Sequence, residues 1–372
     1  MYKFDERIVI TLDAGGTNLV FSAMQANKFI VDPITLPSNA SNLDLCLKTI
    51  SSGFEQVISK LNQKPVAISF AFPGPADYPN GIIGGYLPNF PSFRDGVALG
   101  PFLKKHFNLP VFINNDGDLF AFGEAIAGAL PETNKRLAEA GSEKRFKNLL
   151  GYTFGTGFGI GMVVNNHLNR GDNSCVETFC LRHKKHPDVF VEEGVAIRAI
   201  KRVYKELSGD DSALEPKDIC DIADGKRAGN AESAKAAFAE FGEIAGDAMA
   251  TAATLVDGLI VIGGGLTGAR KYFMPALLNE FEGNLYSLSG DKLNRMQMKV
   301  FDLDDEAQFK QFAKGDSRPL KVYGSDDIVT YDPMKRIGVT ISKLGASQAI
   351  SIGAYSFALS QIDSATNEQT IE

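Results

Sequence analysis

The chain has 372 residues, more than one hydrophobic core usually supports, so we expect two lobes with a binding site between them. Hydrophobic residues make up 44% of it and charged residues 22%, which is ordinary globular composition and excludes the fibrous and disordered classes. The formal net charge of -7 and the lack of a long Lys/Arg run argue against a nucleic-acid partner.

The first elements in the chain are predicted to form a β-hairpin. Residues 8–12 are β-branched and apolar, AGGTN is a turn cluster, and residues 19–24 resume a strand. The same order returns later, where strands at 149–154 and 162–164 flank the glycine-rich turn GTGFGIG. This internal repeat predicts one hairpin in each lobe.

Between and after the hairpins, helices alternate with strands, which is typical of an α/β fold. The predicted elements are a helix at 44–61, a strand at 66–72, a helix at 100–107, a strand at 111–114, a helix at 119–130, a helix at 231–256, a strand at 258–262 and a closely packed helix at 344–359. The charged residues 131–148 are interpreted as a solvated insertion. Residues 289–334 are polar, with strand-like fragments MQMKVFDL and RPLKVYG, and predict no clear arrangement.

The cysteine content and the chain start favour a cytoplasmic protein. Four cysteines are few for this length, and the first residues carry charges and then turn directly into a strand pattern, without a secretory leader. No stretch approaches the roughly 20 uninterrupted apolar residues of a membrane span.

The turn DAGGTN is a candidate phosphate-binding loop. Asp13 ends a buried strand, and Gly15 and Gly16 let the next backbone N–H groups face an anion. Thr17 and Asn18 add side-chain donors. No GK[ST] follows and the next element is a strand, which disfavours a P-loop or Rossmann site. A glycine pair can also serve hairpin geometry alone, and that alternative stays open.

The second loop contains Gly155, Thr156 and Gly157 and gains weight because it repeats the first. Two such loops would hold a triphosphate, with Asp13 reaching Mg²⁺ directly or through water. A third cluster, Gly263–Gly265, would let an adenine ring approach the backbone. A tight strand-to-helix turn is the alternative for that cluster.

A base is also needed for phosphoryl transfer, and the NND motif ends a predicted strand with Asp116. Carboxylates at strand ends in α/β folds commonly line the ligand crevice. The alternative is a helix cap supplied by Asp116 or Asp118. Glu177 and Glu192 are candidate acceptors for sugar hydroxyls, although isolated glutamates in polar segments usually lie at the surface.

Cys175, Cys180, His183 and His186 lie close together in the sequence. Zinc accepts such ligands, but the spacing C-x4-C-x2-H-x2-H matches no common structural-zinc pattern and RHKKH is basic. We expect no zinc site, and whether these residues bind a metal stays open.

The ordered motifs DAGGTN, FPGPAD, NFP, NNDGDLFAFGE, FGTGFGIG, VIGGG and LGASQAISIGA resemble the ROK family of bacterial sugar kinases and regulators, within the hexokinase/actin-like ATPase superfamily. The resemblance implies a two-domain ribonuclease H-like/actin-like ATPase fold with a duplicated β-hairpin phosphate-binding unit and an interdomain cleft. It implies a small α/β domain at 1–117, joined by a C-terminal helix at about 345–362. The large domain would span 118–344, with insertions near 131–147 and 289–334.

The resemblance also implies residue roles. Asp116 matches the catalytic base. The matches to sugar-binding positions are Asn89, Asn115, Asp116, Glu177 and Glu192. The matches to the family's phosphate loops are Gly15, Gly16, Thr17, Thr156 and Gly157, and Gly264 and Gly265 fall at the adenosine site. The loops themselves add Asp13, Asn18 and Gly155 as ATP-binding candidates, with Asp13 also the candidate for magnesium.

The chain departs from the family near its zinc motif. The stretch reads ETFC and then LRHKKHPDVFVE, so Cys180 holds the usual histidine position and the cysteine loop is absent. Zinc is therefore not expected by resemblance either. His183 is the candidate to replace the missing histidine as a sugar contact.

We therefore expect ATP- and Mg²⁺-dependent phosphorylation of a hexose at its primary hydroxyl, with glucose as the leading candidate. Mannose, fructose and N-acetylated amino sugars stay open, as does oligomeric state, with a homodimer compatible with the family. One alternative is a sugar-responsive regulator without kinase activity, although the first strand begins by about Ile8 and leaves no room for a helix-turn-helix. Another is an actin-like ATPase that binds a polypeptide.

Overall fold

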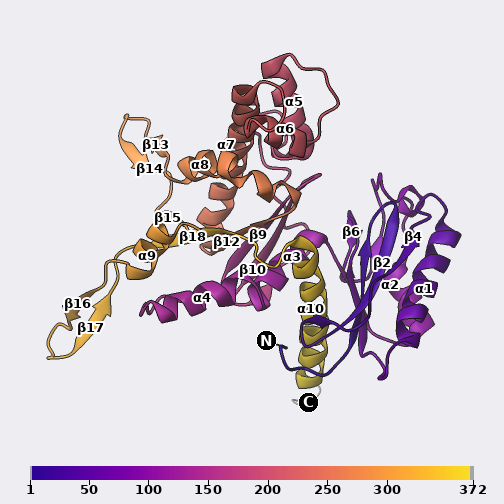
Figure 1. Cartoon of the computed structure of the whole chain (residues 1–372). Coiled ribbons are helices and arrows are strands. Elements are labelled where there is room, and N and C mark those ends of the chain that lie inside the picture. The colour runs from indigo at the N-terminus through magenta and orange to yellow at the C-terminus, as the bar shows by residue number, and fades with distance from the viewer. Residues whose placement is uncertain (1, 369–372) are drawn as a thin grey trace. The chain divides into compact units, whose positions relative to one another are not determined.

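The computed structural model describes residues 2–368, and their contacts divide the chain into two compact units (Figure 1). The first unit holds the chain up to Gly128, Gly161–Val176 and the residues from Lys343 on. The second unit holds Ala129–Ile160 and Glu177–Ser342. The sequence-based division into domains at 1–117 and 118–344 stays a prediction.

The first unit is an α/β structure built on a six-stranded sheet in the order β3-β2-β1-β5-β8, with β4 paired to β2. The bounds are β1 (Val9–Ala14), β2 (Asn18–Gln25), β3 (Lys28–Phe29), β4 (Ile34–Pro37), α1 (Leu43–Ser59), β5 (Ala67–Ala71), β6 (Ala76–Asp77), β7 (Ile82–Ile83), α2 (Leu99–Phe107), β8 (Val111–Asn114), α3 (Asp116–Ile126), β11 (His167–Leu168) and α10 (Ala346–Glu368). Strands β1 and β2 form an antiparallel hairpin, while β1, β5 and β8 run parallel.

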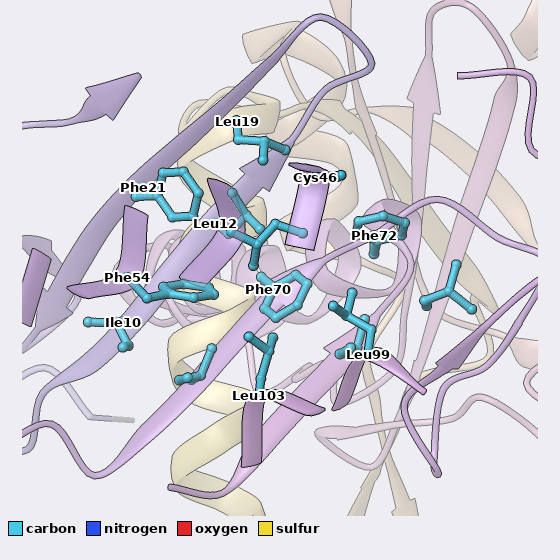
Figure 2. Close-up of a cluster of buried hydrophobic side chains, with 14 of the residues drawn as sticks. Ile10, Leu12, Leu19, Phe21, Cys46, Phe54, Phe70, Phe72, Leu99 and Leu103 are labelled. Carbon is cyan, nitrogen blue, oxygen red and sulfur yellow. The ribbon is translucent and has the colours of Figure 1, made fainter. Parts of the chain in front are cut away.

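Alternation of apolar side chains along β1 places a core on each face of this sheet. On one face Ile10 and Leu12 belong to a buried cluster with α1 and α2, where Phe54 lies edge-on to Phe21 at 5.2 Å between ring centroids (Figure 2). On the other face Val9 packs against buried residues of α10. The sheet is therefore covered on both sides, which holds the ends of its central strands rigidly in place.

The second sheet has the order β11-β10-β9-β12-β18-β15, in which β9, β12, β18 and β15 are parallel and belong to the second unit, whereas β11 belongs to the first. The bounds are α4 (Ala129–Glu139), β9 (Leu149–Phe154), β10 (Phe158–Val164), α5 (Ile197–Ser208), α6 (Pro216–Ala223), α7 (Ala231–Val256), β12 (Leu259–Gly263), α8 (Arg270–Phe281), β13 (Asn284–Tyr286), β14 (Lys292–Asn294), β15 (Lys299–Asp302), α9 (Glu306–Lys314), β16 (Arg318–Lys321), β17 (Ile328–Tyr331) and β18 (Arg336–Ile341). Strand β10 continues into the first unit after Ile160. The predicted α/β class and the second strand-turn-strand element are confirmed.

Two sequence predictions require correction. The second turn is shorter than GTGFGIG, because β10 already begins at Phe158, where Phe158 and Ile160 alternate into the core. The stretch predicted to be a solvated insertion is helical over α4. Leu130, Thr133 and Leu137 recur at helical spacing on its buried side, and this pattern outweighs the charged residues between them.

The polar region at 289–334, for which the sequence predicted no arrangement, contains one core strand and several peripheral elements. Strand β15 joins the sheet beside β18. Two separate hairpins, β13–β14 and β16–β17, lie before and after it in the chain. No helix between residues 2 and 368 combines the length and the apolar surface that crossing a lipid bilayer requires.

Candidate functional site

The carboxyl ends of three parallel strands gather polar residues at one edge of the first unit. The register pairs Asp13 of β1 with Ala71 of β5, and Ala71 in turn with Asn114 of β8. Asp13 and Asn114 are therefore level with each other, two strands apart, at a separation of roughly 10 Å. This edge holds the DAGGTN turn and the NND motif together, as strand-end chemistry predicts.

The first glycine turn lies against the NFP motif. A Cβ atom added to Gly16 would lie 3.0 Å from Cβ of Asn89, so Asn89 contacts the turn directly. On its other side the backbone N–H of Ser38 donates to the Thr17 carbonyl at 2.9 Å, and the Ser38 hydroxyl donates to the Gly16 carbonyl. These contacts fix the turn, while its residues up to Asn18 remain exposed to solvent.

Asn115 caps helix α3, and this frees the carboxylate of Asp116. The Asn115 side-chain oxygen accepts a hydrogen bond from the backbone N–H of Asp118 at 2.5 Å. The alternative in which Asp116 or Asp118 supplies the cap is therefore wrong, because α3 begins at Asp116, and both aspartates already lie within its first turn. Asp116 lies in the first turn of α3, with its side chain exposed and its Oδ1 accepting the Gly117 N–H at 2.9 Å.

The two carboxylates at this edge hold protons more tightly than ordinary aspartates. Although Asp116 is accessible, the protein surrounds it closely enough that desolvation raises the pKa of Asp116, and the nearby charge of Asp13 raises it further. The hydrogen bond from Gly117 opposes this increase. Desolvation also raises the pKa of Asp13. An aspartate with a raised pKa is a better proton acceptor than an ordinary one.

Sequence reasoning missed Arg170, whose side chain donates a hydrogen bond to the first residue of the NND motif. Its Nη1 donates to Oδ1 of the fully buried Asn114 at 2.8 Å, and its guanidinium lies 5.0 Å from the ring centroid of Phe357 in α10. Burial lowers the pKa of Arg170, and the charge of Asp118 opposes that shift. Arg170 follows β11 and lies more than 50 positions from the motif, so no local pattern identified it.

In the second unit the two other glycine clusters lie side by side. Strands β9 and β12 are neighbours, with Thr153 level with Gly263. Gly264 has a φ of 95°, and a Cβ there would overlap the Phe154 backbone, so only glycine fits. The turn after β9 and the turn after β12 thus present adjacent exposed backbone at Thr156 and Gly265.

Glu192 lies directly on the second glycine turn. Its Oε2 accepts the backbone N–H of Phe158 at 2.9 Å, and a Cβ added to Gly157 would lie 2.8 Å from the same oxygen. Arg198 of α5 holds the other oxygen, Oε1, at 2.9 Å and donates to the Thr156 carbonyl at 3.2 Å. The sequence did not single out Arg198, which brings a cation to this turn.

The loop between Glu177 and Glu192 closes on itself. The backbone N–H of Glu192 donates to the Phe179 carbonyl at 3.3 Å, and Arg182 pairs with Phe190 in an isolated antiparallel bridge. Glu177 is half-buried at the start of this loop. Both glutamates therefore belong to one closed segment of the second unit.

His183 lies inside that loop, with 2% of its surface exposed. Its Nδ1 accepts the backbone N–H of Lys185 at 3.1 Å, and its Nε2 lies against Gly194. Desolvation lowers the pKa of His183. Its expected sugar contact stays a prediction.

The four residues weighed as metal ligands are in different surroundings. Cys175, Cys180 and His186 are exposed, whereas His183 is buried. Within residues 2–368, no group of three or more His, Cys, Asp or Glu side chains is arranged to hold a metal ion.

Comparison with known proteins identifies related chains. A model of the ROK family matches residues 9–178. The crystal structure of a glucokinase from Parabacteroides distasonis is 58% identical, superposes with a TM-score of 0.90, and covers 97% of this chain and 99% of its own.

Two further similarities are more partial. The xylose repressor of Bacillus spizizenii is 33% identical over 117 residues, which is 31% of this chain and only 26% of the repressor. A ROK family glucokinase from Streptomyces griseus, solved in complex with glucose and AMPPNP, has a TM-score of 0.59 at 17% identity and covers 93% of this chain and 98% of its own. At that identity the likeness concerns the fold alone.

Proposed function

Because the chain belongs to the ROK family, we propose that it transfers the γ-phosphoryl group of ATP to the primary hydroxyl of a hexose, with glucose as the first candidate. The observation that carries the proposal is the position of Asp116, whose carboxylate is accessible, has a raised pKa and lies at the same sheet edge as Asp13 and the first glycine turn. The 58% identity with a protein described as a glucokinase supports it.

In the proposed reaction Asp116 accepts the proton of the attacking hydroxyl while the oxygen bonds to the γ-phosphorus and ADP leaves. Asn115 is fixed as the helix cap beside it and presents its amide group next to the base. Asn89, held against the first turn, is proposed to bind a sugar hydroxyl. The accepted proton then leaves Asp116 for solvent, to which its side chain is accessible.

The residues of the first unit also fit a divalent cation that accompanies ATP. Asp13 offers a carboxylate at the end of β1, and magnesium prefers such oxygen ligands together with phosphate oxygens. Bound magnesium would neutralise charge on the transferring phosphate. The exposed backbone of the turn that follows Asp13 is proposed to bind phosphate through its N–H groups.

From the second unit we propose that Glu177 and Glu192 accept hydroxyl hydrogen bonds from the sugar and that the turns at Thr156 and Gly265 contact the nucleotide. The closed loop that contains both glutamates supports the first role. The exposed, side-by-side turns after β9 and β12 support the second. Glu192 already accepts the backbone N–H of Phe158 at the second glycine turn. It therefore connects the residues proposed to bind the sugar with the turn proposed to bind the nucleotide.

A coupled assay of ADP release with glucose, mannose, fructose and N-acetylated amino sugars tests the proposal. Asp116→Asn removes the base with almost no change in shape and is expected to lower kcat by about 10²–10⁴-fold. Asp32→Asn is the matched control, because Asp32 is exposed next to β4 at the opposite edge of the same sheet. Near-native turnover by Asp116→Asn would contradict the assignment of the base.

A regulator that binds sugar without phosphorylating it is the second candidate, since a xylose repressor aligns with part of the chain. That function predicts saturable sugar binding with no ADP release for any sugar in the panel. It also predicts salt-sensitive, sequence-specific DNA binding in a gel-shift experiment.

A further inference from the structure

Strands β16 and β17 form a two-stranded sheet of their own, separate from the main sheet of the second unit. Figure 1 shows it extending away from the sheet of the second unit, and every residue of both strands is exposed. An isolated two-stranded hairpin is only marginally stable in water, whereas three or more strands with an apolar face are stable. The exposed large apolar residues of this hairpin are Leu320, Val322, Tyr323, Ile328, Val329 and Tyr331.

The hydrogen-bonding register decides which backbone groups face outward. The ladder pairs Pro319 with Thr330 and Lys321 with Ile328. The N–H of Val322 donates to the Asp327 carbonyl at 2.9 Å, so the pair at 322 and 327 points inward. Since direction alternates along an antiparallel ladder, the backbone groups of residues 319, 321, 328 and 330 point outward.

The two free edges of the hairpin are not equivalent. On β16 the outward positions are Pro319, which has no N–H, and Lys321, which carries a charge. Proline and lysine are the residues by which natural sheets block edge-to-edge pairing. On β17 the outward positions are Ile328 and Thr330, and both keep an N–H and a C=O. One edge is therefore blocked and the other is open.

We propose that β17 pairs with β17 of a second copy of this chain, in antiparallel orientation, to form a four-stranded sheet across a two-fold axis at Val329. In this register Ile328 of one copy lies opposite Thr330 of the other. The N–H of each of these two residues donates to the C=O of the other. The two-fold axis generates the same pair of hydrogen bonds a second time. The proposal is independent of the proposed kinase function.

Charge complementarity favours a second copy as the partner. In the two-fold register Asp327 lies opposite Tyr331 of the other copy. The guanidinium of Arg318 lies 5.6 Å from the Tyr331 ring centroid on the same face, so each copy brings a cation toward an aspartate of the other. Two other flanking aspartates already pair with cations, Asp326 with Lys321 at 2.7 Å and Asp332 with Arg336 at 2.5 Å. Among the described residues, the carboxylate of Asp327 accepts a hydrogen bond only from the neutral hydroxyl of Ser325, at 2.8 Å.

Light scattering coupled to size exclusion over a concentration series tests the proposal on the full chain. The wild-type chain is expected to reach about twice the 40.1 kDa of one copy. Thr330→Pro removes one outward N–H from each copy and is expected to raise the dimer dissociation constant roughly 30-fold, since two backbone hydrogen bonds are lost by symmetry. Thr330→Val keeps the N–H and is the matched control, expected to dimerise as the wild type does.

A second measurement separates loss of pairing from loss of the hairpin. In hydrogen exchange the amides of Ile328 and Thr330 are expected to gain protection with concentration in the wild type, while the inward amide of Val329 stays protected in Thr330→Pro. Thr330→Lys, which keeps the amide and adds a charge to the edge, is expected to weaken the dimer as well. A monomeric wild-type chain would overturn the proposal. The open edge of β17 would then be a site for a strand of a different protein. Equal masses for Thr330→Pro and Thr330→Val would also overturn the proposal.

Discussion

The two glycine turns have the same strand-turn-strand frame but differ in what faces the turn. In the first, the turn residues are exposed and a carboxylate, Asp13, stands two positions before the first glycine. In the second, Thr153 holds the corresponding position, and the carboxylate comes from Glu192 in a distant loop, where it already binds the N–H of Phe158. The repeat thus supplies similar backbone geometry, and the side chains around each turn give it a separate role.

Among the differences between the two turns, the largest expected effect comes from the carboxylate that only the first turn has in its own strand. Asp13→Asn is expected to lower kcat for hexose phosphorylation by about 100-fold, because it removes a charge placed to stabilise the phosphates and their cation. Steady-state kinetics with ATP and magnesium varied separately measure it. Thr153→Asn, at the matching position of the second hairpin, is the control and is expected to change kcat much less.

The same substitution has a pH signature. Asp116 acts when ionised, so kcat is expected to rise with pH through the raised pKa of Asp116. The charge of Asp13 contributes to that increase, and its removal in Asp13→Asn should move the acid limb of the pH profile to lower pH. An unmoved or upward-shifted limb would show that the two carboxylates are not coupled.

A smaller effect is expected from the first glycine of each turn. A Cβ at Gly15 would lie 2.9 Å from the Asn18 backbone carbonyl, whereas a Cβ at Gly155 would meet no atom within 4 Å. Gly15→Ala is therefore expected to lower the free energy of unfolding by about 1–3 kcal/mol. Gly155→Ala should stay within about 0.5 kcal/mol of the wild type. Urea denaturation of the two variants compares them, and equal losses would contradict this difference between the turns.

The smallest expected effect concerns the glutamate on the second turn. Glu192→Ala should raise KM for the hexose by up to about tenfold, because one hydrogen bond typically contributes roughly 0.5–1.5 kcal/mol net. Glu193→Ala is the control, since Glu193 also pairs with Arg198, at 2.8 Å, and has no contact with the turn among the described hydrogen bonds. Equal changes in KM for both variants would mean that the ion pair with Arg198, and not a contact of Glu192 with the sugar, determines KM.

Much of the fold could be predicted from the sequence because its signals are local. The glycine clusters, the apolar strands and the alanine-rich helix at 231–256 lie where their patterns placed them. The amphipathic helix α4 was obscured because as many charged residues as buried ones lie along it, four of each. Residues 289–334 could not be arranged because the strands of the hairpins β13–β14 and β16–β17 are exposed along their whole length, so their patterns carry no burial period.

By itself the sequence determined the order of the motifs, the residue types that suit phosphoryl transfer and the α/β class, since each depends on neighbours along the chain. Only the tertiary structure decided that Asn115 and not Asp116 caps α3, that Arg170 holds Asn114, and that Glu192 closes the second turn. Arg170 and Glu192 reach partners 56 and 34 positions away. Such contacts depend on how strands and loops pack in space, and no spacing along the chain encodes them.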